Sequence, residues 1–349
     1  MKVFIFFTVL LFLTCTAHCN SPHRVGVLYW SMNIPGQVAM RRGLENEAQK
    51  LNERASTTGK TKIKLLTYVA GDGEAGIERQ IKQMYEVIDE RVDLIIVQPT
   101  DSAALSRPLQ KANGLKIPVI AYDQYINEGD LASYLTSDNY QAGYLDGEYV
   151  SACFTTKMKL RVILVEYPHV SSTVERIDGF LDALHDLSQP YSILRTYEAV
   201  EPKSGKLAGL SIIRDFPQSN SVDVVFCVND GGGLSVVSEL VKAKRTEIFV
   251  ATIDGDPEAV NIIKRKGIIR IDSAQFCGAL GRETMKAGYA LLNNVTPPKH
   301  ILVPTFPITK ETVHRYQGWL MPIPSKFTKP WPSKRPQWDG ATRVKKLGN

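Results

Sequence analysis

The sequence of 349 residues has few of the groups that mark metal or redox sites. Of its five cysteines, two lie in the first twenty residues, which leaves Cys153, Cys227 and Cys277. An odd number of widely spaced cysteines excludes a disulfide framework, although an oxidising compartment would allow one bridge. The six histidines are scattered and show no metal-binding spacing, so we expect no bound metal.

Motifs of nucleophilic catalysis are also missing. The sequence contains no G-x-S-x-G elbow and no recognisable pair of a nucleophile and a base. One stretch, GDGEAG at residues 71–76, fits the dinucleotide fingerprint, with Asp93 about 20 residues further on. It follows the second predicted strand rather than the first, and such a short motif often occurs by chance, so we do not assign it to a nucleotide. We therefore expect no cofactor and no enzymatic activity.

A long hydrophobic run occurs only near the N-terminus, from Val3 to Leu13. It follows Lys2 and precedes small and polar residues, a pattern typical of a secretory signal peptide, which we place at residues 1–19. The run is shorter than the roughly 20 residues that a membrane-spanning helix requires. We therefore expect an exported protein of the periplasm, and we favour signal cleavage over lipid attachment because neither N-terminal cysteine follows a well-suited residue.

Charge and composition favour a folded protein that does not bind nucleic acid. The 42 lysines and arginines against 36 aspartates and glutamates give a net charge of +6, and apart from a cluster near the C-terminus they are spread out. Hydrophobic residues make up 44% of the chain and charged residues 22%, as in well-folded proteins. The roughly 330 residues after the signal exceed one typical core and indicate two domains.

Short β-branched runs alternate with longer amphipathic segments, which is typical of parallel α/β sheets. A first series of predicted strands covers residues 25–30, 63–70, 93–98, 118–123 and 133–138. A second series covers residues 161–166, 191–198, 222–229, 247–254 and 267–275. Between them lie segments with helical spacing, such as residues 77–90. Two series of this kind predict two sheets rather than one.

Polar and aromatic side chains stand where the predicted strands end. In open parallel sheets, ligands bind in the crevice beyond the carboxyl ends of the strands. The residues at these ends are Trp30, Gln98, Asp123, Asn229, Asp254 and Gln275. Carboxylates and amides suit the hydroxyl groups of a polyol, and an aromatic face suits its C–H side. Each polar residue could instead cap a helix or form a turn, but six together favour a binding site.

Seven phrases of the sequence carry a resemblance to a known family. They are VQPTDSAAL, PVIAYDQ, TSDNYQAGYLDGEYV, ERIDGF, VFCVND, TIDGDPEAVNIIKRKG and IDSAQF, in this order. The chain resembles the ribose- and galactose-type periplasmic binding proteins of the type I fold over essentially its whole mature length. This resemblance implies an α/β fold of two doubly wound parallel-sheet lobes joined by a multi-strand hinge.

The resemblance and the strand series together define the expected domains. We assign residues 24–137 plus 276–305 to an N-terminal lobe and residues 138–275 plus 306–321 to a C-terminal lobe. Residues 322–349, rich in proline, tryptophan and lysine, form a tail that cannot be a regular helix or a central strand. We favour a strap packed through Trp331 and Trp338 over a partner-docking tail, because tryptophans usually bury apolar area.

The resemblance also implies site residues. Its hydroxyl-binding positions match Gln98, Asp123, Arg176, Asn229, Asp254 and Gln275. The family's aromatic pair after the first strand is replaced by SMNIPGQ at residues 31–37, so we expect Trp30 and Tyr167 to supply the aromatic contacts. We include Asn33 of that stretch in the ligand-binding set. Gln124, which stands where the family often has a second arginine, completes it.

We therefore predict a monomeric receptor that captures a small polar ligand, most readily a monosaccharide, and delivers it to an ABC permease. Two alternatives stay open at the level of the sequence. The chain could be a co-receptor for a membrane sensor kinase, with an autoinducer-2-like or other small effector as its ligand. A third reading is an exported enzyme acting on a nucleotide or sugar.

Overall fold

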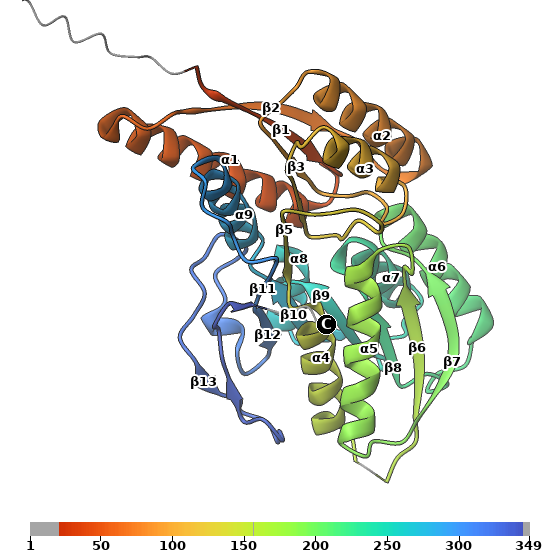
Figure 1. Ribbon diagram of the computed structural model, residues 1–349. Coiled ribbons are helices and arrows are strands. Elements are labelled where there is room, and N and C mark those ends of the chain that lie inside the picture. Colours follow the sequence, from red (N-terminus) through yellow and green to blue (C-terminus); the bar gives the residue numbers. More distant parts are fainter. Residues whose placement is uncertain (1–20, 156, 345–349) are drawn as a thin grey trace, which may run out of the picture.

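The computed structural model describes residues 21–155 and 157–344, and the predicted signal peptide at residues 1–19 lies outside this range. The predicted fold class is confirmed, because the described chain forms two large, mainly parallel sheets, each covered by helices (Figure 1). Within the described residues, no helix combines the length and apolarity needed to cross a membrane.

The N-terminal lobe is built on a seven-stranded sheet. Its strands, in spatial order, are β15 (Arg343–Val344), β11 (His300–Val303), β5 (Ser133–Ser137), β4 (Val119–Tyr122), β3 (Leu94–Val97), β1 (His23–Tyr29) and β2 (Ile63–Val69). Its helices are α1 (Pro35–Thr58) and α9 (Cys277–Leu292), which pack together, and α2 (Gly73–Asp89) and α3 (Ser106–Gly114).

The C-terminal lobe is built on a six-stranded sheet. Its strands, in spatial order, are β12 (Thr305–Thr309), β10 (Ile269–Gln275), β9 (Phe249–Asp254), β8 (Val224–Cys227), β6 (Leu160–Glu166) and β7 (Tyr191–Glu198). Its helices are the packed pair α4 (Asn139–Cys153) and α5 (Ser171–Asp186), together with α6 (Pro202–Asp215), α7 (Asp230–Lys242) and α8 (Pro257–Lys264).

Strand side chains alternate between two buried layers in each lobe. In β3, Ile95 packs in the layer beneath α2 and α3, whereas Ile96 packs in the layer beneath α1 and α9. In β6, Leu164 packs toward α4 and α5, and Val165 packs toward the opposite layer. Burial on both faces explains why these strands read as continuous apolar runs in the sequence.

The chain passes between the lobes near β5–α4, β10–α9 and β11–β12. The first two connections follow predicted strands. The strand pattern does not predict β11 and β12, because both are short and Pro304 and Pro307 interrupt their run. These connections place the carboxyl ends of β4, β9 and β10 close to the junction between the lobes.

The C-terminal tail is a packed strap, as predicted from its tryptophans. Trp331 and Trp338 are buried, and the Trp338 indole donates to the carbonyl of Thr305 at 2.7 Å. Short strands β13 (Phe327–Thr328) and β14 (Gln337–Trp338) form a hairpin, after which β15 pairs with β11 at the edge of the other lobe's sheet. The tail therefore makes a further connection between the two lobes.

Candidate functional site

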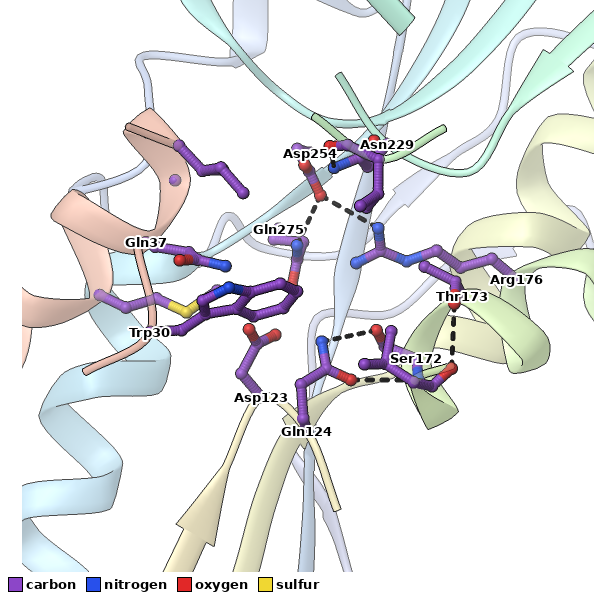
Figure 2. A pocket seen from close by; sticks show the side chains of 15 residues that line it. Trp30, Gln37, Asp123, Gln124, Ser172, Thr173, Arg176, Asn229, Asp254 and Gln275 are labelled. Atoms are coloured by element: carbon purple, nitrogen blue, oxygen red, sulfur yellow. Dashed lines mark hydrogen bonds and ion pairs between the residues drawn. The ribbon is translucent and has the colours of Figure 1, made fainter. Parts of the chain in front are cut away.

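A buried cavity lies between the lobes, at the carboxyl ends of β1, β4, β8, β9 and β10 (Figure 2). Its free volume is only about 30 Å³. Since about 10–15 Å³ is enough for one water molecule, this space suits about two waters. A ligand of the size of a sugar ring therefore requires the lobes to separate and the lining side chains to move.

The N-terminal lobe contributes an aromatic ring, a carboxylate and an amide to this cavity. Trp30 follows β1, and Asp123 and Gln124 follow β4. Behind them, the buried Gln98 accepts from the Trp30 backbone N–H at 3.3 Å and donates to Asp123 Oδ2 at 2.8 Å. Gln98 thus holds Trp30 and Asp123 in position but does not itself line the cavity.

The C-terminal lobe contributes a second carboxylate and the cavity's only lining cation within the described residues. Figure 2 shows Arg176, from α5, directed toward Asp254 at the end of β9, with Nη1 and Oδ1 separated by 3.2 Å. Gln275 donates to the same Asp254 oxygen at 2.6 Å. Arg176 also donates to the carbonyl of Val228 and to the side chain of Asn139, so its guanidinium is fixed in position.

Both cavity carboxylates stand on unfavourable backbone. The φ angle of Asp123 is +65° and that of Asp254 is +139°, and side-chain-bearing residues rarely adopt such values. Backbone strain of this kind costs on the order of 1–3 kcal/mol and gathers at functional sites. The fold therefore turns both carboxylates into the cavity although glycine would be favoured at these positions.

Burial raises the pKa of both carboxylates. For Asp123 the loss of hydration is opposed by the amide of Gln98 and the charge of Arg176. For Asp254 burial is the largest cause and raises the pKa to about 6, although Arg176 and Gln275 favour the ionised form. Hydrogen-bond donors of a ligand would therefore stabilise the ionised form of both carboxylates.

The side chain of Gln124 makes two hydrogen bonds across the lobes at the cavity. Gln124 of the N-terminal lobe donates to Ser172 Oγ at 2.8 Å, and its Oε1 accepts from the Ser172 N–H at 3.4 Å. Ser172 and Thr173 lie in the first turn of α5, about one helical turn before Arg176, and both line the cavity. The sequence prediction missed them, although their position after β6 and before Arg176 was a usable signal.

Gln37 is another cavity residue that the sequence prediction missed. It lies in the first turn of α1, and its side-chain oxygen accepts from the Ser31 N–H at 2.8 Å. Gln37 thereby holds the loop of residues 31–37 against the start of α1. Gln37 is the last residue of the stretch SMNIPGQ, which the sequence analysis had already singled out.

Seven of the ten predicted ligand-binding residues line the cavity, namely Trp30, Asp123, Gln124, Arg176, Asn229, Asp254 and Gln275. Asn33, Gln98 and Tyr167 do not. Asn33 is exposed and donates to Asp72 at 2.6 Å, because the loop after β1 turns it outward. Tyr167 packs against His169 instead, with ring centroids 4.8 Å apart.

Asn229 has a structural role beside its place in the cavity wall. Its side chain accepts from the Gly232 N–H at 3.1 Å, which caps α7, and donates to the carbonyl of Val200 at 3.0 Å. A side chain on Gly232 would meet the backbone of Val200 at 3.1 Å, so the glycines after Asn229 allow α7 to start close to the loop after β7. The helix-cap interpretation therefore holds for this residue.

The described residues contain no group of three or more histidine, cysteine, aspartate or glutamate side chains arranged to hold a metal ion. The described cysteines, Cys153, Cys227 and Cys277, are unbridged. The side chains that line the cavity make it a hydrogen-bonding site with one aromatic wall, Trp30.

Comparisons with known proteins agree with this architecture. A family described as periplasmic binding protein domain matches residues 25–295. The ribose import binding protein of Salmonella typhimurium is 24% identical over 252 residues, which cover 72% of this chain and 79% of that protein.

Two solved structures have the same fold. One is an ABC transporter periplasmic solute-binding protein from Actinobacillus succinogenes with bound D-allose, with a TM-score of 0.70 at 22% identity, covering 84% of this chain and 100% of that one. The other is the fructose-binding periplasmic domain of the hybrid two-component system BT1754, with a TM-score of 0.72 at 20% identity and coverages of 84% and 92%.

Proposed function

This chain belongs to the periplasmic binding protein domain family, and from that premise we propose that it is a periplasmic receptor for a monosaccharide-like polyol. The ligand binds between the lobes, is released chemically unchanged, and passes to an ABC transporter. The observation that carries this proposal is the convergence of Trp30, Asp123, Asp254 and Arg176 on one interlobe cavity.

The lining chemistry supports a neutral, hydroxyl-rich ligand. The indole of Trp30 offers an apolar face for the C–H side of a ring, while each carboxylate can accept from more than one hydroxyl. Arg176 and Gln275 both donate to Asp254, which keeps this buried carboxylate paired. Ligand hydroxyls would take over part of this pairing when the lobes reclose.

Names of similar proteins support a sugar as the ligand and transport as the role. The Salmonella protein is named for ribose import, and the Actinobacillus protein for an ABC transporter with bound D-allose. The loss of the aromatic pair at residues 31–37 makes ribose itself a poor first choice. We therefore place hexoses, furanoses and cyclic polyols before it.

A sensory role is the second candidate, supported by one specific observation. The fructose-binding relative is the periplasmic domain of a two-component system. In that role the closed, ligand-bound lobes would contact a membrane sensor kinase instead of a permease. Deleting the gene distinguishes the roles, because loss of labelled-sugar uptake indicates transport, and loss of a transcriptional response with normal uptake indicates sensing.

Isothermal titration of the mature protein tests the ligand proposal. The panel is allose, fructose, galactose, arabinose, ribose, myo-inositol and autoinducer-2, and mass spectrometry then examines the recovered ligand. We expect one-to-one binding of at least one compound with a Kd of about 1 μM or tighter. Chemical turnover of a panel member, or no binding by any of them, would contradict the proposal.

A further inference from the structure

We call the cavity between the lobes, described above, the cleft. A second cavity lies at the opposite edge of the C-terminal lobe. It is bordered by the end of α4 and by the first residues of β9 and β10, whereas the cleft lies beyond the last residues of these two strands. The end of α4 that borders the second cavity is its lower end in Figure 1. Its free volume is about 380 Å³, and small-molecule sites typically measure about 300–1,000 Å³. The second cavity is thus large enough for a ligand without rearrangement.

The floor of this cavity is apolar. Phe249, Ile263 and Ile269 line it and are only 8%, 2% and 1% exposed. Tyr149 also lines it, and its hydroxyl already donates to Glu311 at 2.9 Å. A ligand on this floor therefore needs an apolar body.

The rim of the cavity is cationic. Lys266, Arg270 and Lys310 line it and are exposed, and no carboxylate among the described residues lines it. Within the described residues, Lys266 and Arg270 have no ion pair, and Arg270 donates only to the Lys266 carbonyl at 3.4 Å. Lys310 Nζ lies 3.5 Å from Glu311 Oε1, so this ammonium is partly compensated. A planar guanidinium beside an uncompensated ammonium is well suited to a carboxylate, sulfonate or phosphate head.

We propose that this cavity binds a small amphiphilic anion. The anionic head contacts Arg270 and Lys266, and the apolar body rests on Phe249 and Ile269. The same chemistry is offered by a free organic acid and by an anionic phospholipid. The site is independent of the function proposed for the cleft, because none of its residues lines that cleft.

Cys153 provides a reporter inside this cavity. It lines the cavity and is exposed, whereas the other described cysteines, Cys227 and Cys277, are buried. Burial around the sulfur raises the pKa of the Cys153 thiol, which the hydrogen bond with Tyr149 opposes. Since the thiolate is the reactive form, alkylation with iodoacetamide is followed at one alkaline pH that is the same for every probe and variant. Peptide mass spectrometry separates Cys153 from every other cysteine of the chain.

The experiment measures the alkylation rate of Cys153 in the full mature protein with three soluble probes and two kinds of vesicle. The soluble probes are 4-phenylbutyrate, its neutral analogue 4-phenylbutanol and inorganic phosphate. The vesicles contain phosphatidylglycerol or phosphatidylcholine. We expect 4-phenylbutyrate or phosphatidylglycerol vesicles to slow alkylation about tenfold at saturation. We expect Arg270→Glu to raise the probe concentration that gives half of this protection about tenfold or more, because it removes charge-assisted hydrogen bonds. The effective probe identifies the source as a free acid or a lipid.

Lys264→Glu is the matched control, because Lys264 is equally exposed on α8 but does not line the cavity. Arg270→Gln is a milder second variant, and thermal unfolding verifies that each variant is folded. The proposal is overturned if neither anionic probe protects Cys153, or if Arg270→Glu and Lys264→Glu behave alike. It is also overturned if the anionic probe that protects is matched by inorganic phosphate alone or by its neutral counterpart, which is 4-phenylbutanol for the acid and phosphatidylcholine for the lipid.

Discussion

At the scale of single residues, Asp254 has the most demanding environment in the cleft. It is buried, stands at φ +139°, and receives hydrogen bonds from Arg176 and Gln275 through one oxygen. A bound polyol would use this carboxylate as an acceptor, so Asp254→Ala should weaken sugar binding by about 2–5 kcal/mol, the cost of leaving buried partners unpaired. Isothermal titration measures the loss. Asn33→Ala, outside the cavity, should leave the affinity unchanged, and equal losses in both variants would place the ligand elsewhere.

The same carboxylate predicts a pH dependence of affinity. The pKa of Asp254 is raised to about 6, mainly by burial. Hydroxyl donors stabilise the ionised form and lower this pKa in the complex, so binding releases a proton below pH 6. Affinity should be constant above about pH 7 and fall as pH drops through 6, by up to about tenfold per pH unit. Titrations between pH 4.5 and 8 test this, and a flat profile for the wild type would argue against a role for Asp254.

At the scale of elements, the strong periodic segments were predictable from the sequence and the short ones were not. Strands β1 to β10 match the predicted series to within a few residues. The central strands are apolar runs because both faces of each sheet are covered, whereas the edge strands β2 and β7 are partly exposed. Strands β11 and β15 gain their hydrogen bonds from partners distant in sequence, and nothing local marks them. Strand-end residues such as Asp123 were predictable because the carboxyl ends of parallel strands meet at one edge of the sheet. The positions of Asn33 and Tyr167 depend on the conformation of loops, which sequence periodicity does not predict.

The strap is held by an ion pair that no sequence pattern could indicate, since its partners are 181 residues apart. Lys329 Nζ lies 2.6 Å from Glu148, and their side chains are only 4% and 0% exposed. Trp331 and Ser333 of the strap donate to the same carboxylate. The strap thereby satisfies a buried charge of α4 and is part of the core of the C-terminal lobe.

Replacing Lys329 therefore tests whether the strap is structural. Lys329→Met leaves the Glu148 carboxylate buried without its cation and should lower the free energy of unfolding by about 3 kcal/mol. The double variant Glu148→Leu with Lys329→Met should recover most of that loss, because it removes both charges. Urea unfolding provides the measurement, with the exposed Lys326→Met as control. If Lys329→Met is as stable as this control, the Lys329–Glu148 ion pair does not stabilise the fold.

At the scale of the whole molecule, a few hydrogen bonds and one ion pair hold the two lobes together around the cleft, and contacts with a ligand would replace them. We call these interactions the interlobe links. The Gln124–Ser172 hydrogen bonds join the two lobes directly, while β15 and the Arg343–Asp138 ion pair, at 3.2 Å, tie the end of the strap to the N-terminal lobe and the start of α4. The cavity behind these links is too small for a sugar ring. Ligand entry therefore requires an opened population, and the links set how large that population is.

Shortening the strap should change this equilibrium. Deleting residues 341–349 removes β15 and the Arg343–Asp138 pair but leaves the strap's contacts with Glu148 and Thr305 in place. The ligand-free protein should then open further, with a larger radius of gyration by small-angle scattering and faster ligand association. The ligand-bound form should keep the wild-type radius, because the ligand itself then joins the lobes. Identical scattering curves for the two ligand-free proteins would show that the strap stabilises one lobe without restraining the hinge.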